Sequence, residues 1–194
     1  MNNVDAQFPQ LETKRLTLKK LTQNDFNILF KYWSDDEVTK YMNIDSMTDI
    51  KQVENMVSFL NNLFNKKQAI RWGIFEKKGN KLIGTCGYNS GFNEEAYIGE
   101  IGYDLGRAYW GHGYMQEALK SIINYGFIEL NLNRIEAYVI PENLKSENTL
   151  GKLGFTKEGI LREHGNYKSN YWDECIYSLL KKEWVYKKIN VKNC

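Results

Sequence analysis

The chain has 194 residues, of which 42% are apolar, so it can bury one hydrophobic core and calls for no second domain. Its formal charge is +2, from 26 basic and 24 acidic residues, which argues against recruitment of nucleic acid or a membrane surface by a strong overall field. No apolar run reaches the roughly 20 residues that span a bilayer, and the polar start MNNVDAQ is not typical of a signal peptide.

Cysteine and histidine usage argues against a metal or disulfide framework. Cys86, Cys175 and Cys194 are odd in number and far apart, so they show neither metal-binding nor redox spacing. The two histidines, His112 and His164, do not cluster with cysteine. We therefore expect no metal site and reduced thiols, as in a cytoplasmic protein.

The first half of the chain predicts a strand, two helices and three further strands. Residues 15–19 (RLTLK) alternate like a strand, and Thr22 or Asn24 is suited to cap the helix that follows. The apolar side of that helix is formed by Phe26, Leu29, Phe30 and Trp33. The second helix and the three strands are expected at residues 50–64, 69–76, 81–88 and 96–105.

The second half predicts two helices that alternate with strands. A glycine loop opens a helix at 115–130, residues 134–140 form a strand stopped by Pro141, and a short helix ends at Gly154. A closing pair of strands is expected at residues 156–162 and 173–180, linked by a polar stretch at 164–171.

This element order indicates an α+β fold with a single domain. We expect a mostly antiparallel mixed sheet of about seven strands, with helices on both faces. The helix at 115–130 crosses between the strands at 96–105 and 134–140, which would make those two strands parallel neighbours.

The segment YWGHGYM, residues 109–115, indicates an anion site. A strand that runs into a Gly-x-Gly turn opening a helix leaves several backbone N–H groups without partners, and the helix dipole adds positive potential there. Such a turn suits phosphate or pyrophosphate. The alternative is an ordinary tight turn. The dinucleotide fingerprint and the P-loop are both excluded, because Gln116 stands where the former needs a third Gly or Ala and no Gly-Lys-Ser/Thr follows.

Four segments in the order of these elements carry a family resemblance. They are LETKRLTLKKLTQNDF, IGEIGYDLGRAYWGHGYMQEAL, RIEAYVIPENLKSENTLGKLGF and GILREHGNYKSNYWDECIYSLLKKEW. Together they resemble the GNAT superfamily of acetyl-CoA-dependent N-acetyltransferases, and most of all its RimJ/RimL-like branch. The resemblance implies one acetyltransferase domain at residues 11–186, between tails at 1–10 and 187–194.

The resemblance also implies a coenzyme A site. The family's loop pattern, Gln/Arg-x-x-Gly-x-Gly/Ala, falls on Trp110, Gly111, His112, Gly113, Tyr114 and Met115. The backbone amides of this loop would hold the pyrophosphate, although the His112 side chain is also interpretable as merely solvated. Backbone groups of the strand end, Tyr103 to Leu105, would meet the pantetheine arm, and Asn143 matches a pantetheine-contacting asparagine. Helix capping is the alternative role for Asn143.

One family feature is missing from the chain. Many members place a tyrosine, as general acid to the leaving thiolate, in a slot that is Leu150 here. We take Ser146 as the nearest candidate acid, directly or through an ordered water, with a structural role near the helix start as the alternative.

Glu100 is our candidate for the catalytic base. A protonated amine acceptor must lose a proton before it attacks a thioester. Glu100 lies in the middle of a predicted strand rich in Ile, Gly and Tyr, where partial desolvation would make a carboxylate a better proton acceptor. The alternative is an ordinary solvent-facing charge, since the residues at spacing two define no clear polar face.

The sequence leaves the acceptor open. Glu94, Glu95, Glu100 and Asp104 would favour a cationic amine if several face a cleft, and Tyr41 and Tyr138 are candidate walls of its pocket. The resemblance implies a primary amine, either a ribosomal-protein N-terminus or a small amine such as a polyamine or aminoglycoside. A non-catalytic acyl-CoA-binding module is the competing interpretation. Monomer and homodimer both remain open.

Overall fold

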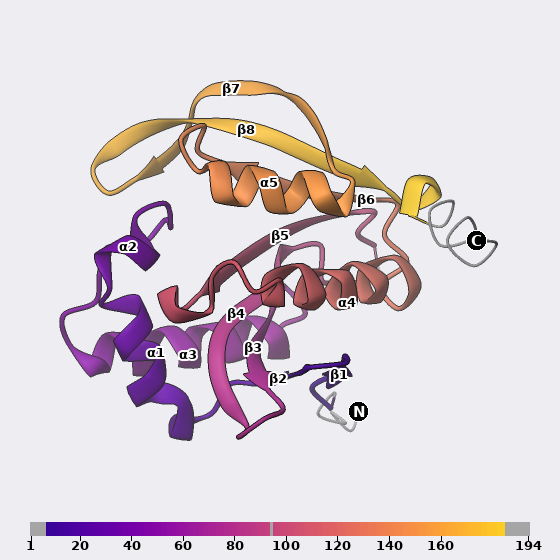
Figure 1. Cartoon of the computed structure of the whole chain (residues 1–194). Coiled ribbons are helices and arrows are strands. Elements are labelled where there is room, and N and C mark those ends of the chain that lie inside the picture. Colours follow the sequence, from indigo (N-terminus) through magenta and orange to yellow (C-terminus); the bar gives the residue numbers. More distant parts are fainter. Residues whose placement is uncertain (1–6, 94, 185–194) are drawn as a thin grey trace.

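An eight-stranded sheet runs through the part of the chain described by the computed structural model, residues 7–93 and 95–184 (Figure 1). The strand order is β1-β2-β3-β4-β5-β6-β8-β7, with every neighbouring pair antiparallel except β5 and β6. The strands are β1 (Leu11–Glu12), β2 (Leu16–Lys20), β3 (Ile70–Glu76), β4 (Lys81–Ser90), β5 (Ile98–Leu105), β6 (Arg134–Val139), β7 (Thr156–Tyr167) and β8 (Asn170–Leu180). The single parallel pair confirms the predicted helical crossover.

Helices cover both faces of the sheet, as predicted. In Figure 1, α4 and α5 lie in front of the strands, whereas α3 passes behind β3 and β4, with α1 packed against it at the side. The α-helices are α1 (Phe26–Trp33), α2 (Asp36–Thr39), α3 (Ile50–Asn65), α4 (Tyr114–Ile128) and α5 (Leu144–Leu153). None of the helices among the described residues combines the length and the apolar character needed to cross a membrane.

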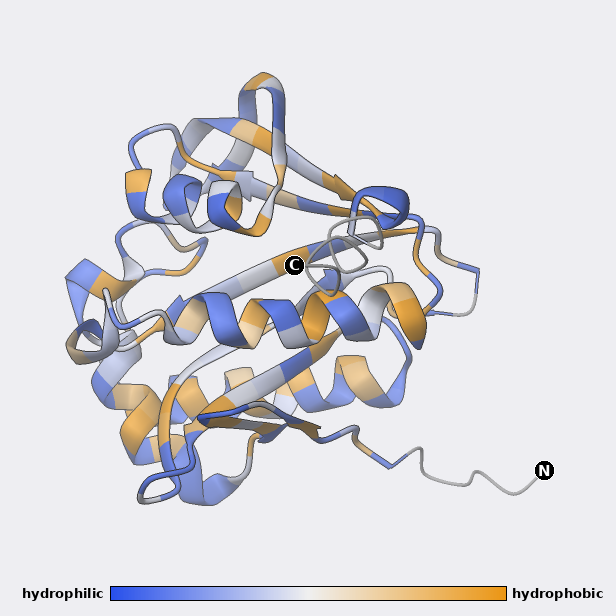
Figure 2. Ribbon diagram, turned by 45° about the vertical axis from the view of Figure 1, so that its right-hand side comes forward, coloured by the Kyte–Doolittle hydropathy of each residue, from blue (hydrophilic) through white to orange (hydrophobic). Residues whose placement is uncertain are grey.

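Two apolar clusters hold these layers together. The larger one packs α4 and α5 against the sheet and includes Trp72, Ile122 and Leu150, all without exposed surface. The smaller one lies under α1 and α3 and includes Leu29 and Trp33. The helical spacing of apolar residues in α4 creates its buried stripe, and Figure 2 shows apolar and polar segments alternating along that helix.

The sheet differs from the expected one in two respects. It has eight strands rather than about seven, because β1 contains only two residues, too few to show an alternating pattern. The polar stretch expected to link the last two strands is part of them, since β7 and β8 pair almost to the hairpin tip at Tyr167 and Asn170. Polar side chains on an exposed hairpin hide the strand pattern there.

Helix α2 was not predicted either. It has four residues and is capped by the Asp35 side chain, which accepts a hydrogen bond from the Glu37 amide. The expected tail at 187–194, with Cys194, and the first six residues of the expected tail at 1–10 lie outside the described residues.

Candidate active site

Strands β5 and β6 form a slot, because they pair over only three positions. Their parallel pairing runs from Ile98 with Arg134 to Glu100 with Glu136, and both strands then continue without pairing to each other. Separated strands present backbone donors and acceptors to whatever lies between them. Both strands lead into helices at their carboxyl ends, the place where open α/β sheets bind ligands.

The glycine loop closes one end of this slot. Gly111 and Gly113 have φ angles of 78° and 75°, a left-handed conformation that glycine adopts at little cost. Gly113 is the N-cap of α4 and offers no side-chain cap. The N–H groups of the first turn therefore have no intrahelical partner. This exposed turn, at the positive end of the helix dipole, suits a phosphate or pyrophosphate group.

Arg15, which directly precedes β2, fixes the shape of this loop. Its Nη1 donates a hydrogen bond to the His112 carbonyl at 3.0 Å, and its guanidinium lies 4.3 Å from the centre of the Tyr114 ring. Its Nε pairs with Glu117 at 2.6 Å. Glu117 also accepts hydrogen bonds from Thr13 and from the Arg15 amide. Burial alone would raise the pKa of Glu117, but these hydrogen bonds and the Arg15 charge outweigh it and hold that pKa below its ordinary value.

Trp110 joins the loop to the end of β5 and to the start of α5. Its indole nitrogen donates to the Leu105 carbonyl at 2.7 Å, so this carbonyl at the end of β5 already has one partner. The Lys145 ammonium from the start of α5 lies 3.8 Å from the centre of the Trp110 ring. A cation and an aromatic ring therefore lie beside the anion-binding turn.

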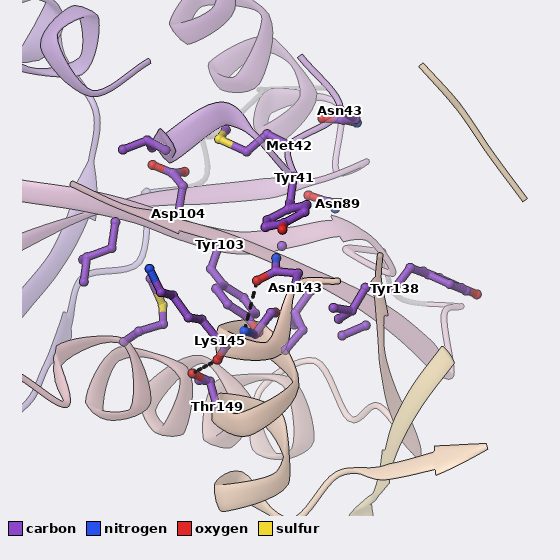
Figure 3. Close-up of a pocket in the computed structure, with 18 of the residues that line it drawn as sticks. Tyr41, Met42, Asn43, Asn89, Tyr103, Asp104, Tyr138, Asn143, Lys145 and Thr149 are labelled. Atoms are coloured by element: carbon purple, nitrogen blue, oxygen red, sulfur yellow. Dashed lines mark hydrogen bonds between the residues drawn. The ribbon is translucent and has the colours of Figure 1, made fainter. Parts of the chain in front are cut away.

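Asn143 and Ser146 begin α5 on the other side of the slot. The Asn143 side chain caps the helix by accepting from the Ser146 amide at 3.2 Å, a bond drawn in Figure 3. The structural alternative for Asn143 is therefore realised, and its amide nitrogen is left to face the cleft that it lines. The Ser146 hydroxyl lies 2.5 Å from the hydroxyl of Tyr103, which comes from β5. Burial raises the pKa of Tyr103 to about 12, so its phenol stays protonated.

Glu100 lies at the other end of the slot, where β5 and β6 begin to separate. It is half-buried and accepts a hydrogen bond from the Asn89 side chain at 2.8 Å. The other amide atom of Asn89, its oxygen, accepts from Arg71 at 3.4 Å, and Arg71 pairs with Asp104 at 3.2 Å. Asp104 is buried and also accepts from Trp33. Glu100 is thus connected to a buried polar network in the sheet.

One cleft of about 1470 Å³ runs along this site. It is lined by every candidate site residue named above, namely Glu100, Tyr103, Leu105, Trp110, Gly111, His112, Gly113, Tyr114, Met115, Asn143 and Ser146. Tyr41 and Tyr138, the predicted pocket walls, also line it, and Figure 3 shows them on the side away from Lys145 and Thr149.

The predicted acidic cluster is only partly realised. Glu100 and Asp104 line the cleft, but Asp104 is buried against Arg71. Glu95 is exposed and does not line the cleft, and Glu94 lies outside the described residues. Within residues 7–93 and 95–184, no three His, Cys, Asp or Glu side chains are grouped so that they could hold a metal ion.

Two further residues noted in the sequence, Cys86 and His164, can be placed in the structure. Cys86 is fully buried, and burial raises the pKa of its thiol to about 12, which agrees with packing rather than nucleophilic chemistry. His164 is exposed and belongs to β7, where it pairs with Glu174 at 2.7 Å and stacks on Tyr138 at 5.0 Å between ring centres.

Sequence reasoning missed the residues that support the site from other elements. These are Arg15, Arg71, Asn89 and the hydroxyl of Tyr103. Each bonds to a partner that is distant in the sequence, with separations from 11 residues for Asn89 and Glu100 to 102 residues for Arg15 and Glu117. No local pattern encodes such contacts. Lys145 alone carried a usable signal, since it follows the capping Asn143 in the first turn of a helix that faces the slot.

Most of the chain matches a known protein family. A family model described as an acetyltransferase (GNAT) domain matches residues 15–156. The chain is 48% identical over 175 residues to the uncharacterized N-acetyltransferase p20 of Bacillus licheniformis, covering 90% of this chain and 98% of that one. It is also 26% identical over 129 residues to the [ribosomal protein uS5]-alanine N-acetyltransferase of Escherichia coli, covering 66% of each chain.

A solved structure shows the same fold at low identity. The crystal structure of the microcin C7 self-immunity acetyltransferase MccE, in complex with acetyl-CoA and AMP, superposes with a TM-score of 0.78 at 22% identity. The alignment covers 87% of this chain and 93% of that one.

Proposed function

Because the chain belongs to the GNAT acetyltransferase family, we propose that it transfers the acetyl group of acetyl-CoA to a primary amine, by direct attack in a ternary complex. The observation that carries this proposal is the slot between β5 and β6. It has an anion-binding turn at one end and the half-buried carboxylate of Glu100 at the other.

Acetyl-CoA is the proposed donor. The amides of residues 111–115 would hold its pyrophosphate, with Trp110 and the His112 side chain beside it. The pantetheine arm would lie in the slot against the backbone of Tyr103 and Leu105 and the side chain of Asn143. The fold shared with MccE, which was solved with acetyl-CoA bound, supports this donor.

Glu100 would accept the proton of the acceptor amine, directly or through one water. An alkyl amine is mostly protonated near neutral pH, so it becomes a nucleophile only after this transfer. The nitrogen then attacks the thioester carbon, whose oxygen is stabilised by backbone N–H groups at the edge of β5. Asn89 supports this role, because its hydrogen bond holds the Glu100 carboxylate in place.

Collapse of the tetrahedral intermediate breaks the carbon–sulfur bond and releases the coenzyme A thiolate. Ser146 would donate a hydrogen bond or a proton to this sulfur. Leu150, which occupies the family's usual tyrosine slot, is fully buried and supplies no such group. The hydrogen bond between Ser146 and Tyr103 supports this assignment. The phenol of Tyr103, which comes from β5, would take the place of the tyrosine that the family usually has at the position of Leu150.

The proposed acceptor is a protein N-terminal α-amine or a small amine. The similarity to the Escherichia coli enzyme, whose name gives a ribosomal protein as its substrate, supports the first class. The size of the cleft accommodates either class.

A coenzyme A release assay tests the function. Purified protein is mixed with acetyl-CoA and a panel of N-terminal peptides, polyamines, aminoglycosides and simple monoamines, and the free thiol is measured. Amine-dependent release supports the proposal. Tight acetyl-CoA binding without release for any amine would instead indicate a non-catalytic acyl-CoA-binding module.

A further inference from the structure

An apolar shelf lines the acceptor half of the cleft. It consists of Met42 and Ile44, from the segment after α2, and Met56 and Leu60, from α3. All four side chains are half-buried, and they pack on the apolar cluster beneath α1 and α3. The core therefore fixes the shelf while part of its apolar surface remains open to the cleft.

The shelf lies on the same face of the sheet as Glu100. Residues two or four apart on a strand share a face, so Glu100 and Asp104 project to the same side. Asp104 accepts a hydrogen bond from the indole of Trp33, which belongs to the cluster that carries the shelf. An acceptor whose nitrogen lies at Glu100 can therefore place its substituent on the shelf.

Aromatic rings form the facing wall, and their partners hold them in place. Tyr138 stacks on His164 and donates to Glu136, while Tyr167 stacks on Trp172 at 6.0 Å between ring centres. Both tyrosines line the cleft. Burial and the bond to Glu136 raise the pKa of Tyr138 to about 12, so this wall carries no phenolate charge.

Two of the carboxylates that line the cleft are already engaged by other side chains. Asp104 is paired with Arg71, and Glu174 accepts from His164 and from the Tyr167 hydroxyl. Glu37 and Glu142 are exposed at the rim. Glu100 is half-buried, and the one hydrogen-bond partner that the described residues give its carboxylate is the neutral amide of Asn89, which matches an acceptor with one positive charge.

The hairpin between β7 and β8 closes this half of the cleft. The Lys168 ammonium at its tip donates to the carbonyl of Thr39 at 2.7 Å and to that of Lys40 at 3.4 Å. This bridge ties the hairpin to the end of α2, and Figure 1 shows the two elements facing each other at one side of the molecule. The bridge holds the hairpin, and with it Tyr167 of the aromatic wall, beside the segment that leads into the shelf.

We infer that the acceptor is a small monoamine that carries an aromatic or branched aliphatic group, which would lie on the shelf while the nitrogen lies at Glu100. This inference rests on the acetyl transfer proposed above. A polyamine or an aminoglycoside would place additional charges against an apolar surface that offers them no counter-ion, which costs free energy.

Initial rates of thiol release with phenylethylamine, putrescine, spermidine, kanamycin and a short N-terminal peptide test the inference. Burial of the phenyl ring should make kcat/KM for phenylethylamine higher than for putrescine by roughly tenfold or more. Phenylethylamine should also exceed the peptide. A higher kcat/KM for a polyamine, for the aminoglycoside or for the peptide overturns the inference.

Two glutamate substitutions on α3 provide a matched pair. Met56→Glu places a charge on the shelf, whereas Ser58→Glu places the same side chain at an exposed position of the same helix that does not line the cleft. Met56→Glu should lower the phenylethylamine to putrescine ratio by roughly tenfold, with acetyl-CoA affinity unchanged, and Ser58→Glu should preserve the ratio. An unchanged ratio in Met56→Glu contradicts the inference.

Failure of the inference and failure of the proposed function give different results. Thiol release that depends on Glu100 but is fastest with a polyamine contradicts the inference and leaves the function intact. Absence of release with every amine contradicts the function and the inference together.

Discussion

The hydroxyl groups of Tyr103 on β5 and Ser146 on α5 lie 2.5 Å apart, and so connect the two sides of the slot. Each hydroxyl carries one hydrogen, and their mutual bond uses only one of the two. The pair therefore keeps one O–H group for a ligand. Because the pKa of Tyr103 is raised to about 12 by burial, this donor persists across the working pH range.

Tyr103→Phe should lower kcat by roughly tenfold and leave the KM for acetyl-CoA nearly unchanged. The change removes a hydrogen bond that strengthens when charge develops on the leaving sulfur, and a tenfold loss corresponds to about 1.4 kcal/mol, near the lower end of the range for such bonds. Steady-state kinetics measures the effect. Tyr177→Phe is the control, because Tyr177 donates to Glu147 and does not line the cleft. Equal losses in both variants would show that the effect is structural.

Glu100→Gln should reduce kcat by roughly a hundredfold or more, the usual contribution of a positioned base. The amide cannot accept the ammonium proton, yet it keeps the size of the side chain. Thiol release under saturating acetyl-CoA is the measurement. Glu95→Gln, at an exposed position that does not line the cleft, should retain full activity. Full activity in Glu100→Gln would refute the assignment.

Glu117 should make the stability of the protein depend on pH in the acid range. Its folded-state pKa lies below the ordinary value of 4.5, so the unfolded chain binds the proton first as the pH falls. The stabilisation is therefore complete above about pH 4.5 and is lost below it. Denaturant unfolding of wild type and Glu117→Gln at neutral and acid pH measures this. The difference in unfolding free energy between the two proteins should shrink in acid, and a constant difference would contradict the account.

Arg71→Met should lower the free energy of unfolding by about 3–5 kcal/mol, because it leaves the buried Asp104 carboxylate without its cation. Urea unfolding measures the loss. Adding Asp104→Asn to Arg71→Met should recover part of it, since the unpaired charge is then removed. No recovery in the double variant would mean that the Arg71 side chain stabilises the sheet by packing rather than by charge.

The sequence was informative wherever a local pattern determines the structure. Helical spacing predicted α3 and α4, and the position of a helix between two strands predicted the parallel pair of β5 and β6. The pattern predicted β7 and β8 but missed their ends at residues 163–167 and 170–172, where the hairpin is largely exposed and polar. It also missed β1 and α2, which are too short to be periodic.

The sequence indicated candidate positions for the site but not the contacts between them. The candidate residues all line one cleft. The bonds that organise them join distant segments, such as Arg15 with Glu117 and Lys168 with Thr39. Such pairs depend on strand order and on which loops the fold brings together, and single-sequence patterns do not encode that information. The hydrogen bond between the Tyr103 hydroxyl and Ser146 was missed for the same reason.

The most direct test of the central claim is a titration of ¹⁵N-labelled protein with acetyl-CoA, followed through the backbone amide resonances. If the turn before α4 holds the pyrophosphate, the amides of Gly111 to Met115 will show the largest shifts, and S-acetylpantetheine, which lacks the pyrophosphate, will leave them nearly unchanged. If acetyl-CoA binds but shifts the resonances of other amides and leaves those of Gly111 to Met115 unchanged, the donor site proposed here is wrong.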